Sequence, residues 1–429
     1  MNINCKWELY DQSYLAIMHK FTEFRGPTDY FHGRDEIINS FLRALDHYQS
    51  SVGGSIFLIK GPPGAGKTAL MSELSKHAES IGYTIVDNIT PSALHDPAAM
   101  AKRLGVPCTP RRDSGGGINA KIVSLFRKKE TVEQPSVVDI IRKAASSNGL
   151  LLVLDEAQHI ADLASPSSVK VKTTSTLNML HNGHVGYPVI LLAGGLGTTE
   201  MAFESLGVSR IEDDLRVRLG ALDAFSTRAV LEDNLRHRCG MESPPAGWIL
   251  TLAKQTHGWP HHIMCYVEAV RQVITEGGEK PTQAALERVL EVGKAYQLAY
   301  YETRAHGINR DQRSLIADLF ADQPIGATIT QRSLMDSLME NHSREDAVEV
   351  FRRALRQGIL DEHTNGDYAI PIPSMQTWLV SEYVPDKSID AVRQPIQKHH
   401  SRKKERGGNQ GLGRYTNAPG VTVSGTATE

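Results

Sequence analysis

The segment GPPGAGKT, residues 61–68, has the residue types and the spacing of a loop that binds phosphate groups. It matches the pattern GxxxxGK[ST], with an apolar segment before it and apolar residues at helical spacing after it. The glycines Gly61, Gly64 and Gly66 allow the backbone to curl, so that its N–H groups converge on phosphate oxygens. The sequence therefore predicts a site for the phosphates of ATP.

Two side chains of this loop are expected to act on the nucleotide directly. Lys67 would bridge the β- and γ-phosphates, and the hydroxyl of Thr68 would hold Mg²⁺. A glycine-rich turn that binds nothing is the alternative, but the strand before the loop and the helix after it favour the phosphate site. Contacts to the nucleotide are expected from the whole segment and the next residue: Gly61, Pro62, Pro63, Gly64, Ala65, Gly66, Lys67, Thr68 and Ala69.

A second motif, LLLVLDEAQHI, ends an apolar strand in two carboxylates. Asp155 is expected to hold the metal shell, and Glu156 to polarise the attacking water. A solvated turn after the strand is the alternative. Together with the phosphate-binding loop, the acid pair predicts Mg²⁺-dependent ATP hydrolysis, with Lys67 and Glu156 as catalytic residues.

These motifs need a scaffold that brings strand ends together, and the sequence predicts one. Short apolar segments occur at YTIVD, LLLVLDE, YPVILLAGG and LRVRLGAL, with helical or irregular segments between them. This alternation indicates an α/β fold, in which helices cover both faces of a parallel sheet. The pattern further along the chain becomes entirely helical, which predicts an all-α lid after the sheet.

The expected organisation has five parts. Residues 1–25 are a helical lead-in, 26–225 the ATPase core, 226–305 the helical lid, 306–385 a winged-helix domain, and 386–429 a disordered basic tail. The winged helix is indicated by three helical segments, followed by GILDEHTNGDYAIPI, which reads as a two-strand wing that turns at Asn-Gly. The tail has too few large apolar residues to pack.

Composition excludes several classes of protein. The chain has 429 residues, and its 47 Lys and Arg are balanced by 49 Asp and Glu, so it is not a strongly basic nucleic-acid coat. Its four cysteines are scattered without metal-type spacing, and the N-terminal residues lack an apolar signal segment. No apolar segment approaches the roughly 18 to 20 residues that span a bilayer. We therefore expect a reduced, cytoplasmic protein with no membrane contact.

Taken together, FHGRDEII, GPPGAGKT, LVLDEAQ, a strand ending in AGG, GVSR and HGWP resemble the AAA+ and STAND branch of P-loop ATPases. The nearest resemblance is to origin-initiator-like and transposon target-selector ATPases, over roughly residues 31–383. In that group the HGRDE-like stretch lies against the adenine, and the resemblance implies this role for Phe31, His32, Gly33 and Arg34. The alternative is an ordinary helix N-terminus, where the acids Asp35 and Glu36 favour the helix dipole.

The same resemblance implies an arginine that reaches the γ-phosphate of a neighbouring subunit, and hence a homo-oligomer in the ATP state. Arg210 in GVSR matches its place, and a guanidinium suits the task because its planar fork spreads charge over phosphoryl oxygens. Arg216 and Arg218 are nearby alternatives. Their period-two spacing in an apparent strand is also typical of a solvated strand face.

Two departures from the family pattern concern nucleotide sensing. The strand ending LLAGG lacks the usual polar sensor residue, which leaves Thr198 or Thr199 as substitutes. His261 stands where many AAA+ proteins have a sensor arginine. The GWP segment resembles the GxP turn of STAND proteins, which implies that Pro260 faces the nucleotide. His261 and His262 could equally be surface residues of the lid.

Duplex DNA is the expected partner. The third helix of the predicted winged helix carries Arg344, Arg352, Arg353 and Arg356, and the basic segment 109–130 would add salt-sensitive contacts to the DNA backbone. Acidic residues on the same helix oppose DNA binding. Two alternatives stay open: a signalling or defence ATPase with a protein trigger encoded nearby, in which the winged helix is an autoinhibitory or partner-binding module, and a nucleotide-stabilised scaffold with negligible hydrolysis.

Overall fold

The computed structural model describes nine stretches of the chain. Several segments that the sequence analysis singled out lie outside them. The predicted lead-in, the basic segment 109–130, Arg210 and the predicted tail lie outside the described residues. All described residues belong to one compact unit. The stretches are 30–51, 54–108, 135–145, 148–164, 167–181, 186–208, 211–340, 342–363 and 366–384.

The predicted parallel sheet is confirmed. Its strands lie in the order β2-β3-β4-β1-β5, and every neighbouring pair is parallel. Continuous apolar sequences form β1, β3 and β4 because these strands are buried on both faces. The strands are β1 (Gly54–Lys60), β2 (Thr84–Val86), β3 (Leu150–Leu154), β4 (Val189–Gly195) and β5 (Arg216–Arg218).

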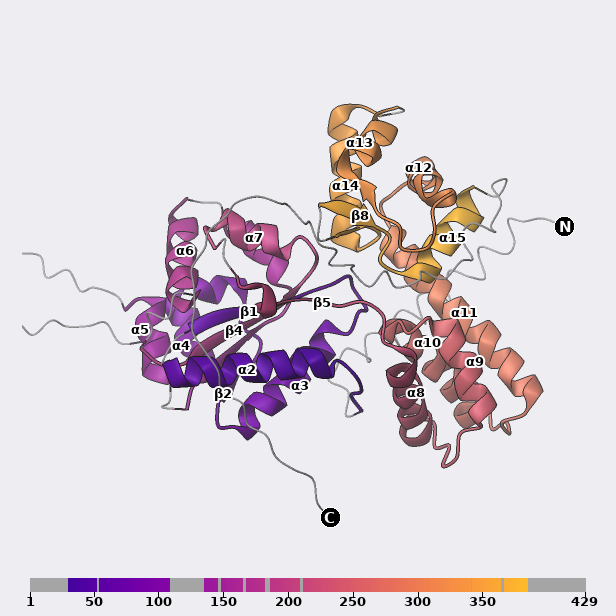
Figure 1. The fold of residues 1–429 in the computed structure, drawn as a ribbon, viewed down its shortest axis with the longest axis horizontal. Helices are drawn as coiled ribbons and strands as arrows, with labels where there is room; N and C mark the ends of the chain where they lie inside the picture. Colours follow the sequence, from indigo (N-terminus) through magenta and orange to yellow (C-terminus); the bar gives the residue numbers. More distant parts are fainter. Residues whose placement is uncertain are drawn as a thin grey trace, which may run out of the picture. The chain divides into compact units, whose positions relative to one another are not determined.

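Helices surround this sheet (Figure 1). In α2, Phe41 and Leu45 are fully buried, which agrees with the helical spacing of its apolar residues. Asp96 caps α4, and Ser136 forms a capping box at α5. The helices are α2 (Asp35–Ser51), α3 (Lys67–Ser80), α4 (Pro97–Leu104), α5 (Val137–Ala144), α6 (Ser167–His181) and α7 (Thr199–Ser205), with short 3-10 helices at Pro91–Leu94, Ala157–Ala164 and Asp213–Leu215.

The strand order decides where the motifs meet. Because β4 lies between β1 and β3, the carboxyl ends of these three strands share one edge of the sheet. The loop 61–68 follows β1, the acid pair follows β3, and the glycines Gly194 and Gly195 end β4. These segments, far apart in the sequence, therefore face one another.

The all-α region has a hydrophobic core of its own, which includes Leu231, Leu252, Ile263 and Val289. Asp223 caps its first helix by accepting from the backbone N–H of Ser226. The described residues contain no helix that is both long and apolar enough to cross a membrane. The helices are α8 (Ala224–Arg238), α9 (Ala246–Thr256), α10 (Pro260–Val270), a π-helical turn at Arg271–Glu276, and α11 (Gln283–Ala305).

The last described part, residues 310–383, is called the C-terminal module here. It contains a three-stranded antiparallel sheet in the order β6-β8-β7. The tip of the predicted wing lies outside the described residues, apart from Gly366. The elements are α12 (Arg310–Ala321), β6 (Ile329–Thr330), α13 (Gln331–Met339), α14 (Arg344–Gln357), β7 (Asp361–Glu362), β8 (Asp367–Ala369) and α15 (Pro373–Tyr383).

The C-terminal module contacts the part of the chain that contains the parallel sheet, at two glycines. Gly358 ends α14 in the left-handed region, with φ 70°, and a Cβ atom there would lie 2.3 Å from Cδ of Pro63 in the loop 61–68. A Cβ atom at Gly197, just after β4, would lie 2.1 Å from Oδ1 of Asp361. Both contacts require a residue without a side chain.

We predict that Gly358→Ala destabilises the protein more than Gly366→Ala does. Both glycines have positive φ, but open space surrounds Gly366, whereas Gly358 lies against the loop. Both variants lose roughly 1 kcal/mol through the left-handed backbone, and Gly358→Ala adds a clash of roughly 1–3 kcal/mol. Urea unfolding of the two variants measures the difference. Equal losses would show that α14 does not contact Pro63 in solution.

Candidate functional site

A cavity of about 1230 Å³ lies at the edge of the sheet where the motifs meet. Its walls come from the loop 61–68, from the end of β3, from the segment before α2, from the lid and from the C-terminal module. A volume of this size accommodates a nucleotide. From the loop and the start of α3, residues 63–69 line the cavity, whereas Gly61 and Pro62 do not line it and contact the site through their carbonyls, which accept from Lys67.

Lys67 lies in the middle of the loop and is almost completely buried. Its Nζ donates to the carbonyl oxygens of Gly61, at 2.9 Å, and of Pro62, at 3.2 Å. Burial lowers the pKa of Lys67, and the charges of Glu156 and Asp155 oppose that shift. A phosphate group would offer this ammonium a charged acceptor, which makes a stronger hydrogen bond than a backbone carbonyl does.

The two predicted metal ligands lie within hydrogen-bonding distance of each other. Oγ1 of Thr68 donates to Oδ2 of Asp155 at 2.7 Å, although the two residues are 87 positions apart. The other carboxylate oxygen of Asp155 accepts from the backbone N–H of Glu156 at 2.9 Å. A hydroxyl and a carboxylate so close together fit Mg²⁺, which prefers oxygen ligands.

Sequence comparison assigns this part of the chain. A family model described as AAA domain matches residues 50–197, which include the phosphate-binding loop and the acid pair. The chain contains an AAA domain. A search of curated proteins finds no significant match to the chain.

Solved structures with a similar fold include the Aeropyrum pernix ORC2 protein in its ADP form. It is 13% identical, the likeness covers 85% of this chain and 97% of that one, and the TM-score is 0.50. The ADPNP-ADP complexes of the same protein give 13% identity, 84% and 97% coverage, and a TM-score of 0.47. At this level of identity the likeness concerns the fold alone.

Glu156 of the AAA domain is held by a residue that the sequence analysis missed. Its backbone is left-handed, with φ 53°, and its side chain accepts a hydrogen bond from Nε2 of Gln158. Oε1 of Gln158 in turn accepts from the backbone N–H of Leu196 at 3.2 Å. Gln158 therefore ties the glutamate to the end of β4. It lies in the DEAQ motif itself, so the signal was present but was not used.

The glycine that ends β4 leaves space for the side chain of Gln158. A Cβ atom at Gly195 would lie 2.8 Å from Oε1 of Gln158 and 2.1 Å from Oγ1 of Thr199. Thr198 and Thr199 are the expected substitutes for a polar sensor residue. Thr199 is fully buried next to Gly195, and its hydroxyl has no hydrogen-bond partner among the described residues. Thr198 lines the cavity.

The segment before α2 closes another side of the cavity, through Phe31, His32 and Arg34. His32 makes a hydrogen bond to the carboxylate of Asp233 on α8. A Cβ atom at Gly33, where φ is 79°, would lie 2.4 Å from Oγ of Ser226, also on α8. The four residues implied as adenine contacts therefore lie between the AAA domain and the lid, and Arg34 is bound to the backbone carbonyls at positions 220 and 221.

The lid contacts the loop of the AAA domain through its backbone. The N–H of His261 donates to the carbonyl of Gly64 at 3.1 Å, and the hydroxyl of Tyr300 donates to the carbonyl of Pro63 at 2.6 Å. The His261 ring stacks on Tyr300, with ring centres 4.1 Å apart. Pro260 begins α10 and lines the cavity. Its contact with the nucleotide stays a prediction.

Both lid histidines are neutral at pH 7. Burial, with a contribution from the charge of Arg304, lowers the pKa of His261 to about 3. Burial lowers the pKa of His262 to about 3 as well. The alternative that places both on the surface is wrong for His262, whose side chain is fully buried. A neutral imidazole at 261 does not supply the positive charge of a sensor arginine.

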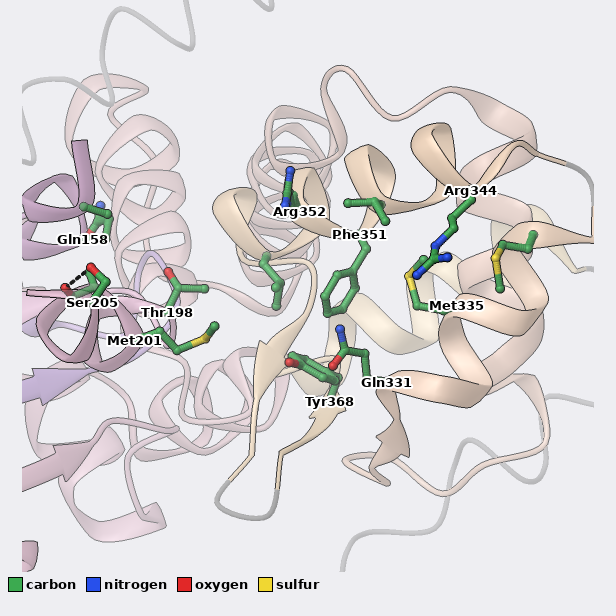
Figure 2. A pocket seen from close by; sticks show the side chains of 15 residues that line it. Gln158, Thr198, Met201, Ser205, Gln331, Met335, Arg344, Phe351, Arg352 and Tyr368 are labelled. Carbon is green, nitrogen blue, oxygen red and sulfur yellow. Dashed lines mark hydrogen bonds between the residues drawn. The ribbon is translucent and has the colours of Figure 1, made fainter. Parts of the chain in front are cut away.

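Arginines from outside the AAA domain also line the cavity, and sequence reasoning did not place them there. They are Arg238 of α8, Arg304 of α11, and Arg352 and Arg356 of α14. The last two were expected to contact DNA. A second pocket, of about 760 Å³, lies between α14 and the core, and Figure 2 shows Arg344, Phe351 and Arg352 there. No motif surrounds Arg304, so the sequence carried no signal for it.

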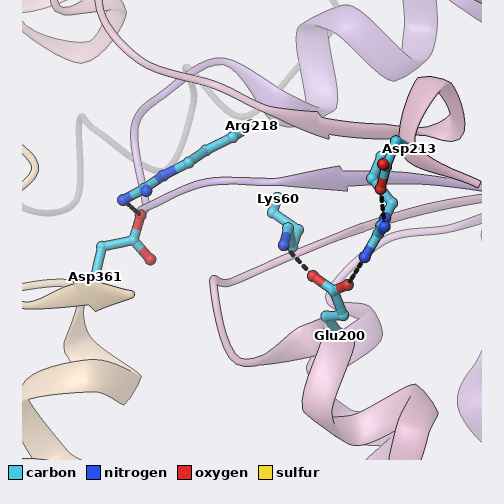
Figure 3. Close-up of polar contacts among 6 residues, drawn as sticks. Lys60, Glu200, Asp213, Arg218 and Asp361 are labelled. Atoms are coloured by element: carbon cyan, nitrogen blue, oxygen red, sulfur yellow. Dashed lines mark hydrogen bonds and ion pairs between the residues drawn. The ribbon is translucent and has the colours of Figure 1, made fainter. Parts of the chain in front are cut away.

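Arg216 and Arg218, the alternatives to Arg210 as the γ-phosphate arginine, are both paired. Figure 3 shows Arg218 beside Asp361. Arg216 binds the carboxylates of Glu200 and Asp213, and the hydrogen bond that Arg216 donates to Glu200 raises the pKa of Arg216. Nη2 of Arg218 lies 2.8 Å from Oδ2 of Asp361 in the C-terminal module. Neither guanidinium is on the purely solvated strand face that the spacing suggested.

We predict that the two neutral histidines make the protein sensitive to acid. Their folded pKa values lie below 6.5, so the unfolded chain binds more protons below that pH, and stability is lost as the pH falls from 6.5 towards 3. The loss by pH 5 is about 2 kcal/mol for each histidine. Denaturant unfolding of the double variant His261→Gln/His262→Gln should show a smaller change between pH 7 and pH 5.

The matched control for this measurement is His77→Gln, because His77 is solvent-exposed on α3. It should keep the pH dependence of the parent. If the double variant and the parent lost the same stability on acidification, the histidines would not be the groups that titrate.

Proposed function

We propose that this protein is a Mg²⁺-dependent ATPase that acts as a molecular switch, with ATP bound in the AAA domain between the loop 61–68 and the lid. The observation that carries the proposal is the direct hydrogen bond between Thr68 and Asp155, beside the buried ammonium of Lys67. It brings a hydroxyl, a carboxylate and a cation to one point at the helix N-terminus. The shared fold with a protein solved in its ADP form supports nucleotide as the ligand.

Each residue of the site has a role in this proposal. The amides of the loop and Lys67 bind the β- and γ-phosphates, while Thr68 and Asp155 hold the Mg²⁺ shell. Mg²⁺ would neutralise charge that develops on the phosphate oxygens. Glu156 orients and polarises the attacking water, and Gln158 holds the carboxylate until the nucleotide is in place.

The proposal extends to assembly and location. Arg210 of one protomer would complete the site of the next, so that the ATP state is a homo-oligomer. The ion pairs of Arg216 and Arg218 within their own chain favour Arg210 for this role. We propose a cytoplasmic protein, since neither the composition nor the described helices indicate a membrane segment.

A switch also needs an element that responds to the nucleotide, and we propose that the C-terminal module, as a winged helix, is that element. Its Asp361 is almost completely buried and pairs with Arg218 of the core, and its Gly358 lies against the loop 61–68. These contacts favour the signalling alternative, in which the module restrains the ATPase until a trigger, such as a protein encoded nearby, releases it. In this arrangement Arg352 and Arg356 of α14 line the cavity.

Duplex DNA stays a prediction as a partner. It depends on the basic segment 109–130, which lies outside the described residues, and on arginines of α14 that the structure places elsewhere. Arg353 donates to the backbone carbonyl of Gly307, and both Arg353 and Arg356 pair with Glu349. DNA binding through Arg353 and Arg356 would therefore compete with these contacts.

We predict that Lys67→Ala abolishes nucleotide binding, and that Glu156→Gln binds ATP but loses turnover by roughly 10²–10⁴-fold. The reason is that Lys67 supplies the charge for the phosphates, whereas Glu156 acts only on the attacking water. Calorimetry measures binding, and phosphate release measures turnover. Lys76→Ala, which removes an exposed lysine from the same helix α3, should behave as the parent does.

Two outcomes would contradict these assignments. Parental turnover by Glu156→Gln would remove Glu156 from the role of base. Tight nucleotide binding without measurable turnover in the parent would instead favour the scaffold alternative.

We predict that Asp361→Asn loosens the C-terminal module and raises basal ATPase activity. Arg218 then keeps its charge without a partner at a contact that is buried on one side, which costs roughly 1–3 kcal/mol. Hydrogen exchange of α14 and of the loop 61–68 should become faster. The swapped variant Arg218→Asp/Asp361→Arg should recover part of the protection.

The control is an exposed ion pair of the lid, Arg288 with Glu279. Glu279→Gln should leave exchange and activity unchanged. If Asp361→Asn behaved in the same way, the module would not restrain the core through this pair.

A further inference from the structure

We infer that Arg304 of α11 contacts the phosphate chain of the nucleotide, and that this contact ties the nucleotide to the helix that leads into the C-terminal module. The inference rests on the proposed function in one respect, because it requires a nucleotide in the loop 61–68. It adds a phosphate ligand from outside the AAA domain, at a position that no motif marks.

Arg304 is a cation without an anionic partner among the residues that the structure describes. Its side chain lines the same cavity as Lys67 and Thr68. Its Nε is buried and has no hydrogen-bond partner, and no carboxylate of the described residues forms an ion pair with it. Its guanidinium carbon lies over the Tyr300 ring, 5.3 Å from the ring centre. A buried donor without an acceptor costs free energy, so its retention calls for an explanation.

Two arginines near Arg304 in the sequence do have carboxylate partners. Near the other end of α11, Arg288 donates to Glu279 at 3.0 Å. Just beyond α11, Arg313 donates to Glu302 at 2.8 Å. Arg304 lies between them and differs in facing the cavity. An anion that enters the cavity would supply the missing acceptor.

The position of Arg304 relative to the loop is set by Tyr300, one helical turn earlier. The Tyr300 hydroxyl donates to the carbonyl of Pro63 at 2.6 Å, which holds this turn of α11 against the loop. Arg304 is also close enough to Lys67 for its charge to lower the pKa of the lysine. Two like charges that face one cavity are favourable when an anion lies between them.

Phosphate is the anion that fits best. A guanidinium presents a planar fork of N–H donors that matches two phosphate oxygens, and it is always charged. The loop 61–68 already provides the amide-lined end of a phosphate site, and Arg304 faces that end from the lid. The ligand class is therefore a nucleoside di- or triphosphate, with the lid arginine as its outer contact.

Helix α11 also contacts the C-terminal module. Next to Tyr300, the hydroxyl of Tyr301 donates to Oγ of Ser374 at 2.7 Å, and its ring lies 5.3 Å from the Trp378 ring of α15. A phosphate that draws Arg304 towards the loop therefore acts on a helix that is bonded to the C-terminal module. The nucleotide state can reach the module through α11, independently of the Arg218 contact.

The experiment compares Arg304→Met, Arg304→Lys and the control Arg288→Met by calorimetry, with Mg-ADP and with a non-hydrolysable Mg-ATP analogue. Arg304→Met should weaken the binding of at least one nucleotide tenfold or more. Arg304→Lys should recover part of the loss because it keeps the charge. Arg288→Met should bind as the parent does. A larger loss for the analogue would place the contact at the γ-phosphate, and equal losses would place it at the β-phosphate.

Two further measurements separate this role from a structural one. Thermal unfolding without nucleotide should be unchanged in Arg304→Lys, and protection of α11 from hydrogen exchange on nucleotide addition should be smaller in Arg304→Met. Parental affinity of Arg304→Met for both nucleotides would overturn the inference and leave the proposed function intact. Absence of nucleotide binding by the parent would overturn both.

Discussion

The hydrogen bond between Thr68 and Asp155 is the contact on which the rest of the site depends. It joins the end of the phosphate-binding loop to the end of β3, and it can form only because β4 separates β1 from β3 in the sheet. Because β4 lies between β1 and β3, the loop and the acid pair are separated by one strand. The same geometry leaves the end of β4 between them, where glycines give space to Gln158 and Thr199. One strand order therefore positions the proposed phosphate site, the proposed metal ligands and Gln158, which holds Glu156.

The loop is contacted from outside the AAA domain at its backbone. Tyr300 and His261 of the lid bind carbonyl groups of Pro63 and Gly64, and Gly358 of the C-terminal module packs on Pro63. Contacts to a backbone respond to changes in loop geometry. A phosphate would compete with the carbonyls of Gly61 and Pro62 for Nζ of Lys67. The lid and the module are thus physically connected to the part of the protein that the nucleotide changes.

The contact made by the C-terminal module and the contact made by the lid differ in charge. At the module, Asp361 and Arg218 neutralise each other, and the pair is complete without a ligand. At the lid, His261 is neutral and Arg304 has no carboxylate partner among the described residues. The first arrangement holds a resting state, whereas the second is completed by an anion. This difference gives a physical reason why nucleotide binding would strengthen the lid contact relative to the module contact.

The sequence by itself determined the parallel α/β core, the phosphate-binding loop and the acid pair, because their signals are local: continuous apolar strands, a glycine pattern, and acids at a strand end. It also identified the positions of Phe31, Arg34 and Pro260, which line the cavity. Only the tertiary structure decided the partners of Arg216, Arg218 and Gln158, and the place of Arg304 in the cavity wall. Pairing across long sequence separations depends on strand order and helix packing, which no local pattern encodes. For the same reason, the sequence favoured a DNA-binding surface for the arginines of α14, whereas the structure shows that Arg352 and Arg356 line the cavity.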